Sequence, residues 1–223
     1  MIKYILFDID DTLFPSSEFA TLARKNALRA MVELGIGVKL DKLEQTLSKI
    51  IKQKGSNYTK HFDDLCSVYK VKRPAKYVAA AVAAYHNSKT SILPFPEVPL
   101  TLLKLRERGY KLYAATNGNT TKQWDKLIRL GIALYFEDVF VSEEMGEEKG
   151  TSFFKKILKK LAARPEECLM IGDRENSDIL PAKSVGIRTI RVKQGKYSKG
   201  KSRADKEIND FTNLLDTIKK MTH

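Results

Sequence analysis

The sequence predicts an α/β fold in which a doubly wound parallel sheet carries an inserted α-helical domain. Two observations lead to this prediction. Segments typical of strands and of helices alternate along residues 91–223, as in parallel sheets whose crossovers are helices. The strand-like residues 4–7 are separated from that region by a purely helical stretch and have no other sheet to join. We therefore expect a core domain of residues 1–15 and 91–223 and a helical cap domain at residues 16–90.

The first expected strand, residues 4–7, is apolar throughout, which is typical of a strand covered by helices on both faces. Asp8, Asp10 and Asp11 follow it directly, at the end of the strand where ligands bind in open parallel sheets. Carboxylates this close repel one another, so the cluster predicts a divalent cation or a lysine as partner. An Asp-rich turn that caps the next helix is the structural alternative.

The inserted region reads as a small helical bundle. Apolar residues recur there with the spacing of a helix, and Gly35 and Gly55 end the first two segments. Asp41 and Glu44 resemble an N-terminal capping pair, and Pro74 suits the first turn of the last helix. The four expected helices cover residues 20–34, 41–54, 61–69 and 74–85.

Prolines at 94 and 96 mark the return to the core domain, where strands and helices alternate. The expected helices lie near residues 97–108, 120–130, 151–163, 178–185 and 208–221. The expected strands lie at residues 110–115, 139–141, 168–171 and 188–192.

Polar residues follow two of these strands. Thr116, Asn117 and Gly118 come after the strand at 110–115 and offer a hydroxyl and backbone amides that lead into a helix N-terminus. Such a loop suits phosphate oxygens, and a simple capping loop is the equal alternative.

The strand at 168–171 is followed by Asp173 and Asp178, which add two carboxylates at the same edge of the sheet. Lys149 precedes that strand and is the candidate to neutralise the acidic cluster. Taken singly, the two aspartates could cap a helix and the lysine could lie on the surface.

The formal net charge is +13, and residues 188–203 hold seven Lys and Arg residues without an acidic one. Such a segment attracts phosphates, including those of nucleic acid. A solvated lysine-rich surface is the commoner case, however, and aromatic residues do not interleave as they do in RNA-binding surfaces. We therefore do not expect nucleic acid as a partner. A nucleic-acid-binding module that uses residues 188–203 remains the alternative function that is not enzymatic.

Features of membrane and secreted proteins are not apparent in the sequence. There is no apolar run of membrane-spanning length and no N-terminal secretory pattern, so we expect a cytoplasmic protein without membrane contacts. Cys66 and Cys168 lack metal-binding spacing and are expected to be reduced thiols. His61, His86 and His223 lie outside the polar loops and are expected to be surface or cap residues.

In this order the polar loops resemble the four motifs of the haloacid dehalogenase-like (HAD) superfamily, over nearly the whole chain. Residues 8–12, Asp-Ile-Asp-Asp-Thr, look like its first motif, DxDxT. Thr116 resembles the second motif and Lys149 the third, and Gly172-Asp173 through Asp178 resembles the fourth, GDxxxxD. The helical insertion is similar to the cap that follows the first motif in part of this superfamily.

The resemblance implies a chemistry for these residues. Asp8 would attack a phosphate monoester and form an aspartyl-phosphate, and Asp10 would protonate the leaving alkoxide and later accept a proton from water. Relatives that remove halide lack this second aspartate, so its presence favours phosphate transfer. The metal would be Mg²⁺, with Asp8, the Asp10 carbonyl and Asp173 as ligands and Asp178 in support.

The resemblance also implies a small anionic phosphate ester as substrate, such as a sugar or triose phosphate. Thr116, Asn117, Gly118 and Lys149 would bind its phosphoryl oxygens. Members with a cap of this kind include small phosphatases described as acting on glyceraldehyde 3-phosphate. Asn57 and Tyr58, in a polar stretch between cap helices, are the candidate residues for specificity. A phosphomutase is the alternative within the superfamily, and we expect a monomer or homodimer.

Overall fold

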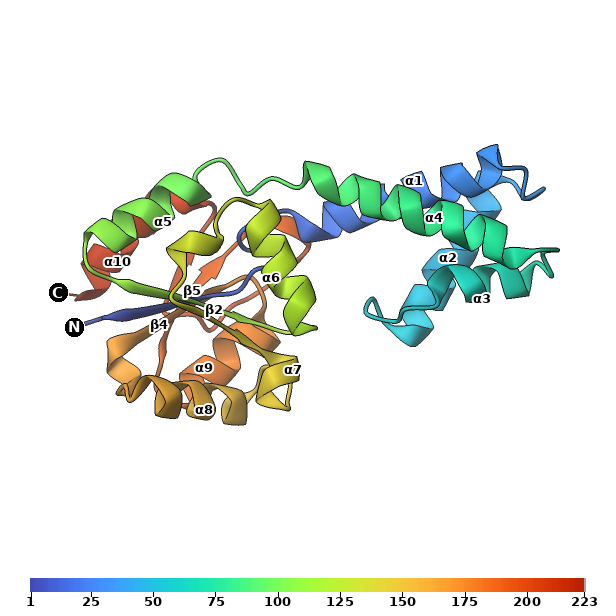
Figure 1. The fold of residues 1–223 in the computed structure, drawn as a ribbon. Helices are drawn as coiled ribbons and strands as arrows, with labels where there is room; N and C mark the ends of the chain where they lie inside the picture. The colour runs from blue at the N-terminus through green and yellow to red at the C-terminus, as the bar shows by residue number, and fades with distance from the viewer. Residues whose placement is uncertain (223) are drawn as a thin grey trace. The chain divides into compact units, whose positions relative to one another are not determined.

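The computed structural model describes residues 1–222, so His223 lies outside the described residues. The chain forms two compact units (Figure 1). The first contains Met1–Ser17 and the chain from Leu93 to the described end, and the second is Glu18–Ile92.

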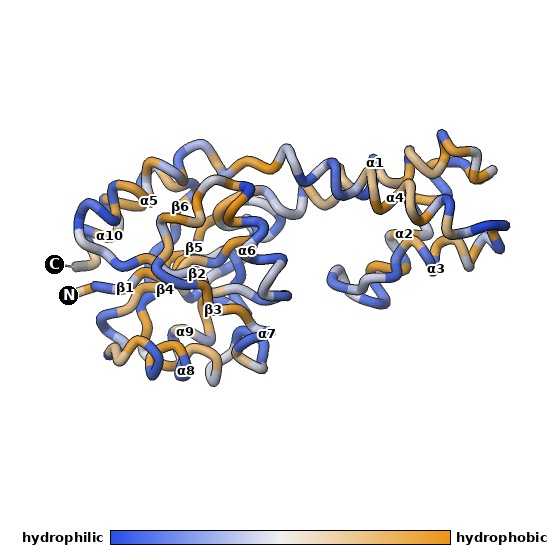
Figure 2. The backbone as a smooth tube through the Cα atoms, in the orientation of Figure 1, coloured by the Kyte–Doolittle hydropathy of each residue, from blue (hydrophilic) through white to orange (hydrophobic). Residues whose placement is uncertain are grey.

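The first unit contains a six-stranded parallel sheet with the strand order β3-β2-β1-β4-β5-β6, which confirms the predicted doubly wound fold. The strands are β1 (Tyr4–Phe7), β2 (Lys111–Thr116), β3 (Asp138–Val141), β4 (Cys168–Gly172), β5 (Arg188–Val192) and β6 (Lys206–Ile208). Strand β1 lies between β2 and β4, and its residues Ile5, Leu6 and Phe7 are fully buried. Figure 2 shows the hydrophobic character of the inner strands.

Helices cover both faces of this sheet, with α5 and α10 on one face and α8 and α9 on the other (Figure 1). The helices of this unit are α5 (Val98–Glu107), α6 (Thr120–Arg129), α7 (Ser142–Met145), α8 (Thr151–Leu161), α9 (Leu180–Ser184) and α10 (Leu214–Thr222).

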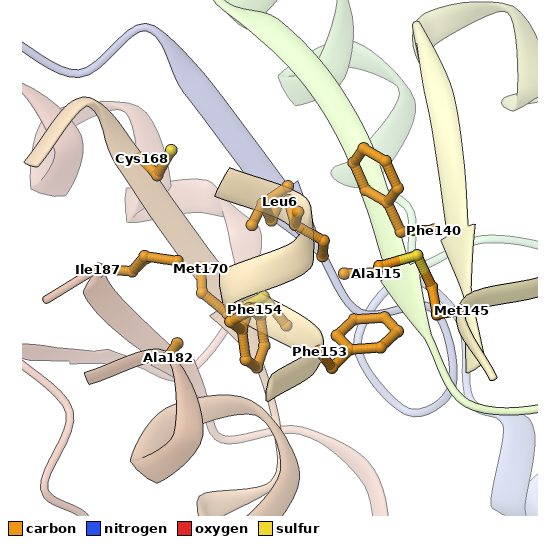
Figure 3. Packing of buried hydrophobic residues seen from close by; sticks show 11 residues of the cluster. Leu6, Ala115, Phe140, Met145, Phe153, Phe154, Cys168, Met170, Ala182 and Ile187 are labelled. Carbon is orange, nitrogen blue, oxygen red and sulfur yellow. The ribbon is translucent and has the colours of Figure 1, made fainter. Parts of the chain in front are cut away.

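The face covered by α8 and α9 has a dense apolar core (Figure 3), in which Leu6 and Met170 of the sheet pack with Phe153 and Phe154 of α8. On the other face Phe7 stacks against Phe211, with 6.3 Å between the ring centroids. Burial of both faces explains why the first strand is apolar throughout.

The second unit is a bundle of helices with its own core. It is built mainly from α1 (Ser16–Glu33), which begins at the end of the first unit, α2 (Leu40–Lys54), α3 (His61–Val68) and α4 (Pro74–Ser88). Its buried residues include Ala27, Met31, Leu43, Leu47 and Leu65. The glycines and the proline that punctuate this stretch delimit the helices as expected, with Gly55 as C-cap of α2 and Pro74 in the first turn of α4. Its role as a cap domain stays a prediction.

Two details of the predicted elements are wrong. The last helix begins at Leu214, not near residue 208, because Lys206–Ile208 form the edge strand β6, in which only Ile208 is buried. Asp41 does not cap α2 but lies in its first turn, and the N-cap is Lys39, without a side-chain hydrogen bond.

Two further observations concern the cysteines and the character of the helices. Cys66 and Cys168 are buried free thiols, as predicted. Among the helices of residues 1–222, none combines the length and apolar character that crossing a membrane requires.

Candidate active site

The carboxyl ends of three adjacent strands bring the predicted motif residues to one edge of the sheet. In the register of the sheet, Phe7 of β1 lies opposite Ala114 of β2 and Ile171 of β4. Asp8, directly after β1, is therefore flanked by the ends of β2 and β4, which carry Thr116 and Asp173. Parallel pairing alone thus assembles residues that are more than a hundred positions apart in the sequence.

Three of the predicted carboxylates form a buried cluster. Asp8, Asp173 and Asp178 are all buried, and one carboxylate oxygen of each lies within 4.8 Å of the others. The Thr12 hydroxyl is 3.4 Å from both Asp8 Oδ2 and Asp173 Oδ1, and it donates to these acceptors. The Arg174 backbone N–H donates to Asp178 Oδ2 at 2.9 Å, which fixes the third carboxylate.

Lys149 lies among these carboxylates. Its side chain is buried, and its ammonium donates to Asp8 Oδ1 and, at 2.5 Å, to Asp178 Oδ1. Burial acts to lower the pKa of Lys149, but Asp178 and Asp8 outweigh it and raise that pKa. The Lys149 backbone N–H also donates to Asn117 Oδ1 at 2.7 Å, which joins the lysine loop to the loop after β2.

The cluster has more negative charge than Lys149 neutralises. Three carboxylates and one ammonium leave a net charge of −2 when all are ionised. Burial raises the pKa of Asp8 to about 7, in spite of Lys149, and burial together with Asp8 raises the pKa of Asp173 to about 8. Asp8 and Asp173 thus resist ionisation until a further cation compensates them.

The donor set fits a divalent cation. Within residues 1–222, Asp173 Oδ2 is buried without a hydrogen-bond partner, although Asp173 lies in the middle of the charged cluster. An orphaned carboxylate oxygen of this kind carries a desolvation cost that a bound cation removes. Oxygen donors alone suit a hard ion such as Mg²⁺ or Ca²⁺.

The two other aspartates of the first motif have different surroundings. Asp10 is partly exposed, and both its oxygens accept hydrogen bonds from Lys126 Nζ of α6, at 2.6 and 2.7 Å. Asp11 is buried and accepts from the backbone N–H and the hydroxyl of Ser17, at 2.8 and 2.5 Å. Asp11 therefore secures the start of α1.

The loop after β2 is held in place by α7. Gly118 N–H donates to Ser142 Oγ at 2.8 Å, and Thr120 N–H donates to Glu143 Oε2 at 2.8 Å. These two backbone amides are therefore engaged within the protein. The Thr116 side chain is buried, and the binding of phosphoryl oxygens by Thr116 and Asn117 stays a prediction.

Sequence reasoning missed Ser142, Glu143 and Lys126. The first two belong to an acidic run that showed no periodic pattern, and the lysine is one of many on helix surfaces. Only the tertiary structure brings them to the site loops.

Asn57 and Tyr58 belong to the helical unit, in the turn between α2 and α3. Asn57 is exposed, and the Tyr58 ring packs edge-on against His61 with 5.3 Å between centroids. Their part in substrate binding stays a prediction.

The basic segment 188–203 is partly internal to the fold. Arg191 is buried and donates to the carbonyl of Asp173 and to four carbonyls of residues 197–201. Arg188 donates to the carbonyls of Met221 and Glu166. Two of the seven cationic side chains thus bind main-chain carbonyls of the fold, and the absence of a nucleic-acid partner stays a prediction.

The parallel sheet thus carries at its carboxyl edge three buried carboxylates and an embedded lysine, a set of oxygen donors that could hold a metal ion. The chain belongs to the haloacid dehalogenase-like hydrolase family, whose sequence pattern matches residues 2–186.

Among known proteins, the chain is similar to the glyceraldehyde 3-phosphate phosphatases of Methanocaldococcus jannaschii and Methanopyrus kandleri. Each is 44% identical to it, over 99% of this chain and 99% of the relative. The fold is also similar to the crystal structure of a putative beta-phosphoglucomutase from Thermotoga maritima, with a TM-score of 0.75 and 16% identity over 98% of this chain and 99% of that one.

Proposed function

We propose that this hydrolase is a Mg²⁺-dependent phosphatase that releases phosphate from a small phosphate monoester, with glyceraldehyde 3-phosphate as the first candidate substrate. The observation that carries the proposal is the buried cluster of three carboxylates around Lys149, with one orphaned oxygen on Asp173. The candidate substrate follows from relatives of this name that are 44% identical along nearly the full chain.

Asp8 is the proposed nucleophile. Its oxygen forms a bond to phosphorus while the ester bond to the alcohol breaks, and Asp10 gives its proton to the departing oxygen. In the second half of the reaction a water oxygen attacks the phosphorus, the bond to Asp8 breaks, and Asp10 takes up a proton of the water. One group thus serves first as acid and then as base.

Asp8, Asp173 and the Asp10 carbonyl are the proposed Mg²⁺ ligands, with Asp178 in support. The ion, when bound, neutralises the carboxylates and the phosphoryl oxygens so that an anionic nucleophile can approach an anionic substrate. Lys149, the Thr116 hydroxyl and the Asn117 backbone amide are the proposed partners of the same phosphoryl oxygens as negative charge shifts between them.

The test is phosphate release from glyceraldehyde 3-phosphate and from p-nitrophenyl phosphate, with Mg²⁺ and with EDTA. We expect EDTA to abolish release and Asp8→Asn to lower kcat by about a thousandfold or more, because it removes the nucleophile. Asp216→Asn, at an exposed position of α10, is the matched control and should retain full activity. Undiminished release by the Asp8→Asn variant would contradict the assignment.

The same assay separates the alternatives. A phosphomutase would need a bisphosphorylated activator and release little phosphate, whereas a phosphatase needs no activator. A nucleic-acid-binding module would retain its affinity after loss of Asp8, and that affinity would fall steeply with salt. The proposal also places the enzyme in the cytoplasm as a monomer or homodimer, and sedimentation velocity tests its oligomeric state.

A further inference from the structure

Asp10, the proposed acid and base, is bound by a residue from a distant part of the chain. Lys126 Nζ donates to both oxygens of its carboxylate, at 2.6 and 2.7 Å, and the side chains are 27% and 36% exposed. An ion pair at the surface contributes little to the free energy of unfolding. The Lys126–Asp10 pair is therefore of interest for its position beside the active site.

Lys126 is fixed by the helix that carries it. Gln123, one turn earlier on α6 and on the same side of the helix, is buried and donates through Nε2 to the Asn117 carbonyl at 2.7 Å. The N-cap of α6 is Asn119, which accepts from the Lys122 backbone N–H. One face of α6 thus contacts both the loop after β2 and the acid of the first motif.

Phe14, at the end of the first-motif loop that contains Asp10, also lies near Lys126. Its ammonium lies 5.9 Å from the centroid of the Phe14 ring, and that ring is buried. Phe14 closes the loop of the first motif, because its carbonyl accepts from the Asp11 backbone N–H at 3.0 Å. Lys126 therefore contacts Asp10 and also lies near Phe14, at the end of the first-motif loop.

We propose that Lys126 is a positioning residue that holds the Asp10 carboxyl group in place for proton transfer to the leaving alcohol. The inference rests on the proposed function and adds a residue to it. In the structure the ammonium binds both oxygens of the carboxylate. When Asp10 carries the proton, the three donors and flexible stem of Lys126 allow it to keep the carbonyl oxygen of the acid while the O–H group faces the leaving oxygen. Without Lys126 the Asp10 side chain would sample other rotamers and would meet the leaving oxygen less often.

The contribution of Lys126 to the rate depends on how strongly the leaving alcohol requires a proton from Asp10. A triose alkoxide is a poor leaving group and requires a proton from Asp10, whereas p-nitrophenolate departs readily without one. The value of kcat/KM reports only the steps up to release of the alcohol, so later attack by water does not affect it. A comparison of kcat/KM for the two esters therefore isolates the acid step.

The experiment measures kcat/KM for glyceraldehyde 3-phosphate and for p-nitrophenyl phosphate with saturating Mg²⁺. We expect Lys126→Met to lower the first value by about 10- to 100-fold, within the range of acid catalysis, and the second by less than about threefold. Lys126→Arg keeps a charged donor and should restore part of the loss for the triose ester. Lys122→Met, at an exposed position of the same helix, should change neither value.

The outcomes are distinct. Equal loss on both esters, or no loss on either, would overturn the role of Lys126 while leaving the proposed function intact. Failure of the unmodified enzyme to release phosphate from both esters would instead overturn the proposed function. Retained activity on p-nitrophenyl phosphate shows that a variant is folded, and Lys126→Gln provides a second neutral variant should Lys126→Met not fold.

Discussion

Gly172 and Asp178 are in such close contact that a Cβ atom at position 172 would lie 2.5 Å from Asp178 Oδ2 and 2.7 Å from Asp178 Cβ. Asp178 cannot move aside freely, because it accepts hydrogen bonds from Lys149 and from the Arg174 backbone. The glycine of the fourth motif is therefore required by the carboxylate that ends the motif.

Gly172→Ala should consequently displace Asp178 and, with it, Lys149. We expect a loss of stability of about 1–3 kcal/mol, as for other overpacked sites, and a fall in kcat of at least about tenfold. Gly150→Ala is the matched control, because its nearest neighbour would be a backbone oxygen at 3.7 Å and its backbone is extended. Thermal unfolding and phosphate release measure the two effects, and equal behaviour of the two variants would contradict the argument.

Mg²⁺ should stabilise the protein more at high pH than at low pH. The pKa of Asp8 is raised to about 7 and that of Asp173 to about 8, from an ordinary value of 3.8. Between the unfolded and the folded pKa values the folded protein without metal binds more protons than the unfolded chain. Its free energy of unfolding therefore falls as the pH rises through that range.

A cation that binds the ionised carboxylates reverses this loss. At about a hundredfold excess over its Kd, Mg²⁺ should raise Tm by roughly 5–10 °C at pH 8. The gain should be smaller at pH 6, where bound protons compete. Scanning fluorimetry with Mg²⁺ and with EDTA at both pH values measures this. Asp173→Asn is the control that should lose the gain, and an equal Mg²⁺ effect at both pH values would count against the prediction.

A second pH effect belongs to the opposite end of the sheet. Glu167, directly before β4, accepts from Lys3 Nζ at 2.7 Å and from the Arg164 backbone N–H at 3.0 Å. The Lys3 hydrogen bond, with help from Arg164, lowers the pKa of Glu167 to about 2. Its contribution to stability is thus complete above its unfolded pKa, near 4.5, and is lost as the pH falls toward 2.

Glu167→Gln should therefore lower Tm at pH 7, and the difference from the unmodified protein should shrink as the pH falls below about 4.5. Activity should not change, because this end of the sheet is remote from the acid cluster. Glu166→Gln, whose side chain is 59% exposed, is the control and should have little effect at either pH. Circular dichroism at a series of pH values provides the measurement, and a pH-independent difference would refute the assignment.

The sequence was sufficient to predict helices whose ends are determined by single residues at those ends. Gly55 ends α2 and Pro74 opens α4, and both act through their own backbone. Strand β6 escaped prediction because two of its three residues, Lys206 and Glu207, are exposed, so it has no apolar pattern. An edge strand of this length is determined by its pairing with β5. A local sequence pattern does not report such pairing.

The same distinction applies to the site. Asp8 and Asp173 could be found because each follows a recognisable strand, and Lys149 because it resembles the third motif of the family. Lys126 could not, since a lysine on an amphipathic helix is usually solvated, and its contact with Asp10 spans 116 positions. Residues that support a site from other elements need the tertiary structure.

Arg191 shows how a side chain from the basic segment supports the site. Its guanidinium donates through Nε to the Asp173 carbonyl at 3.1 Å and through Nη2 to the Tyr197 carbonyl at 2.6 Å. Further bonds reach the carbonyls of residues 199–201. The loop at 195–201 is therefore attached to the backbone of a proposed metal ligand through one planar group.

Arg191→Lys should break this arrangement, because a lysine has three donors from a single nitrogen and cannot reach carbonyls on several sides. Leaving the buried Asp173 carbonyl unpaired should cost about 1–3 kcal/mol, while the more exposed carbonyls of the loop can turn to water. The released loop carries Lys196, Lys199 and Lys201, so trypsin should cleave it faster in the variant, and a higher Mg²⁺ concentration should be needed for half-maximal activity. Arg203→Lys, at an exposed position, should change neither property. Unaltered cleavage and an unaltered Mg²⁺ requirement in Arg191→Lys would show that the loop holds its place without the guanidinium.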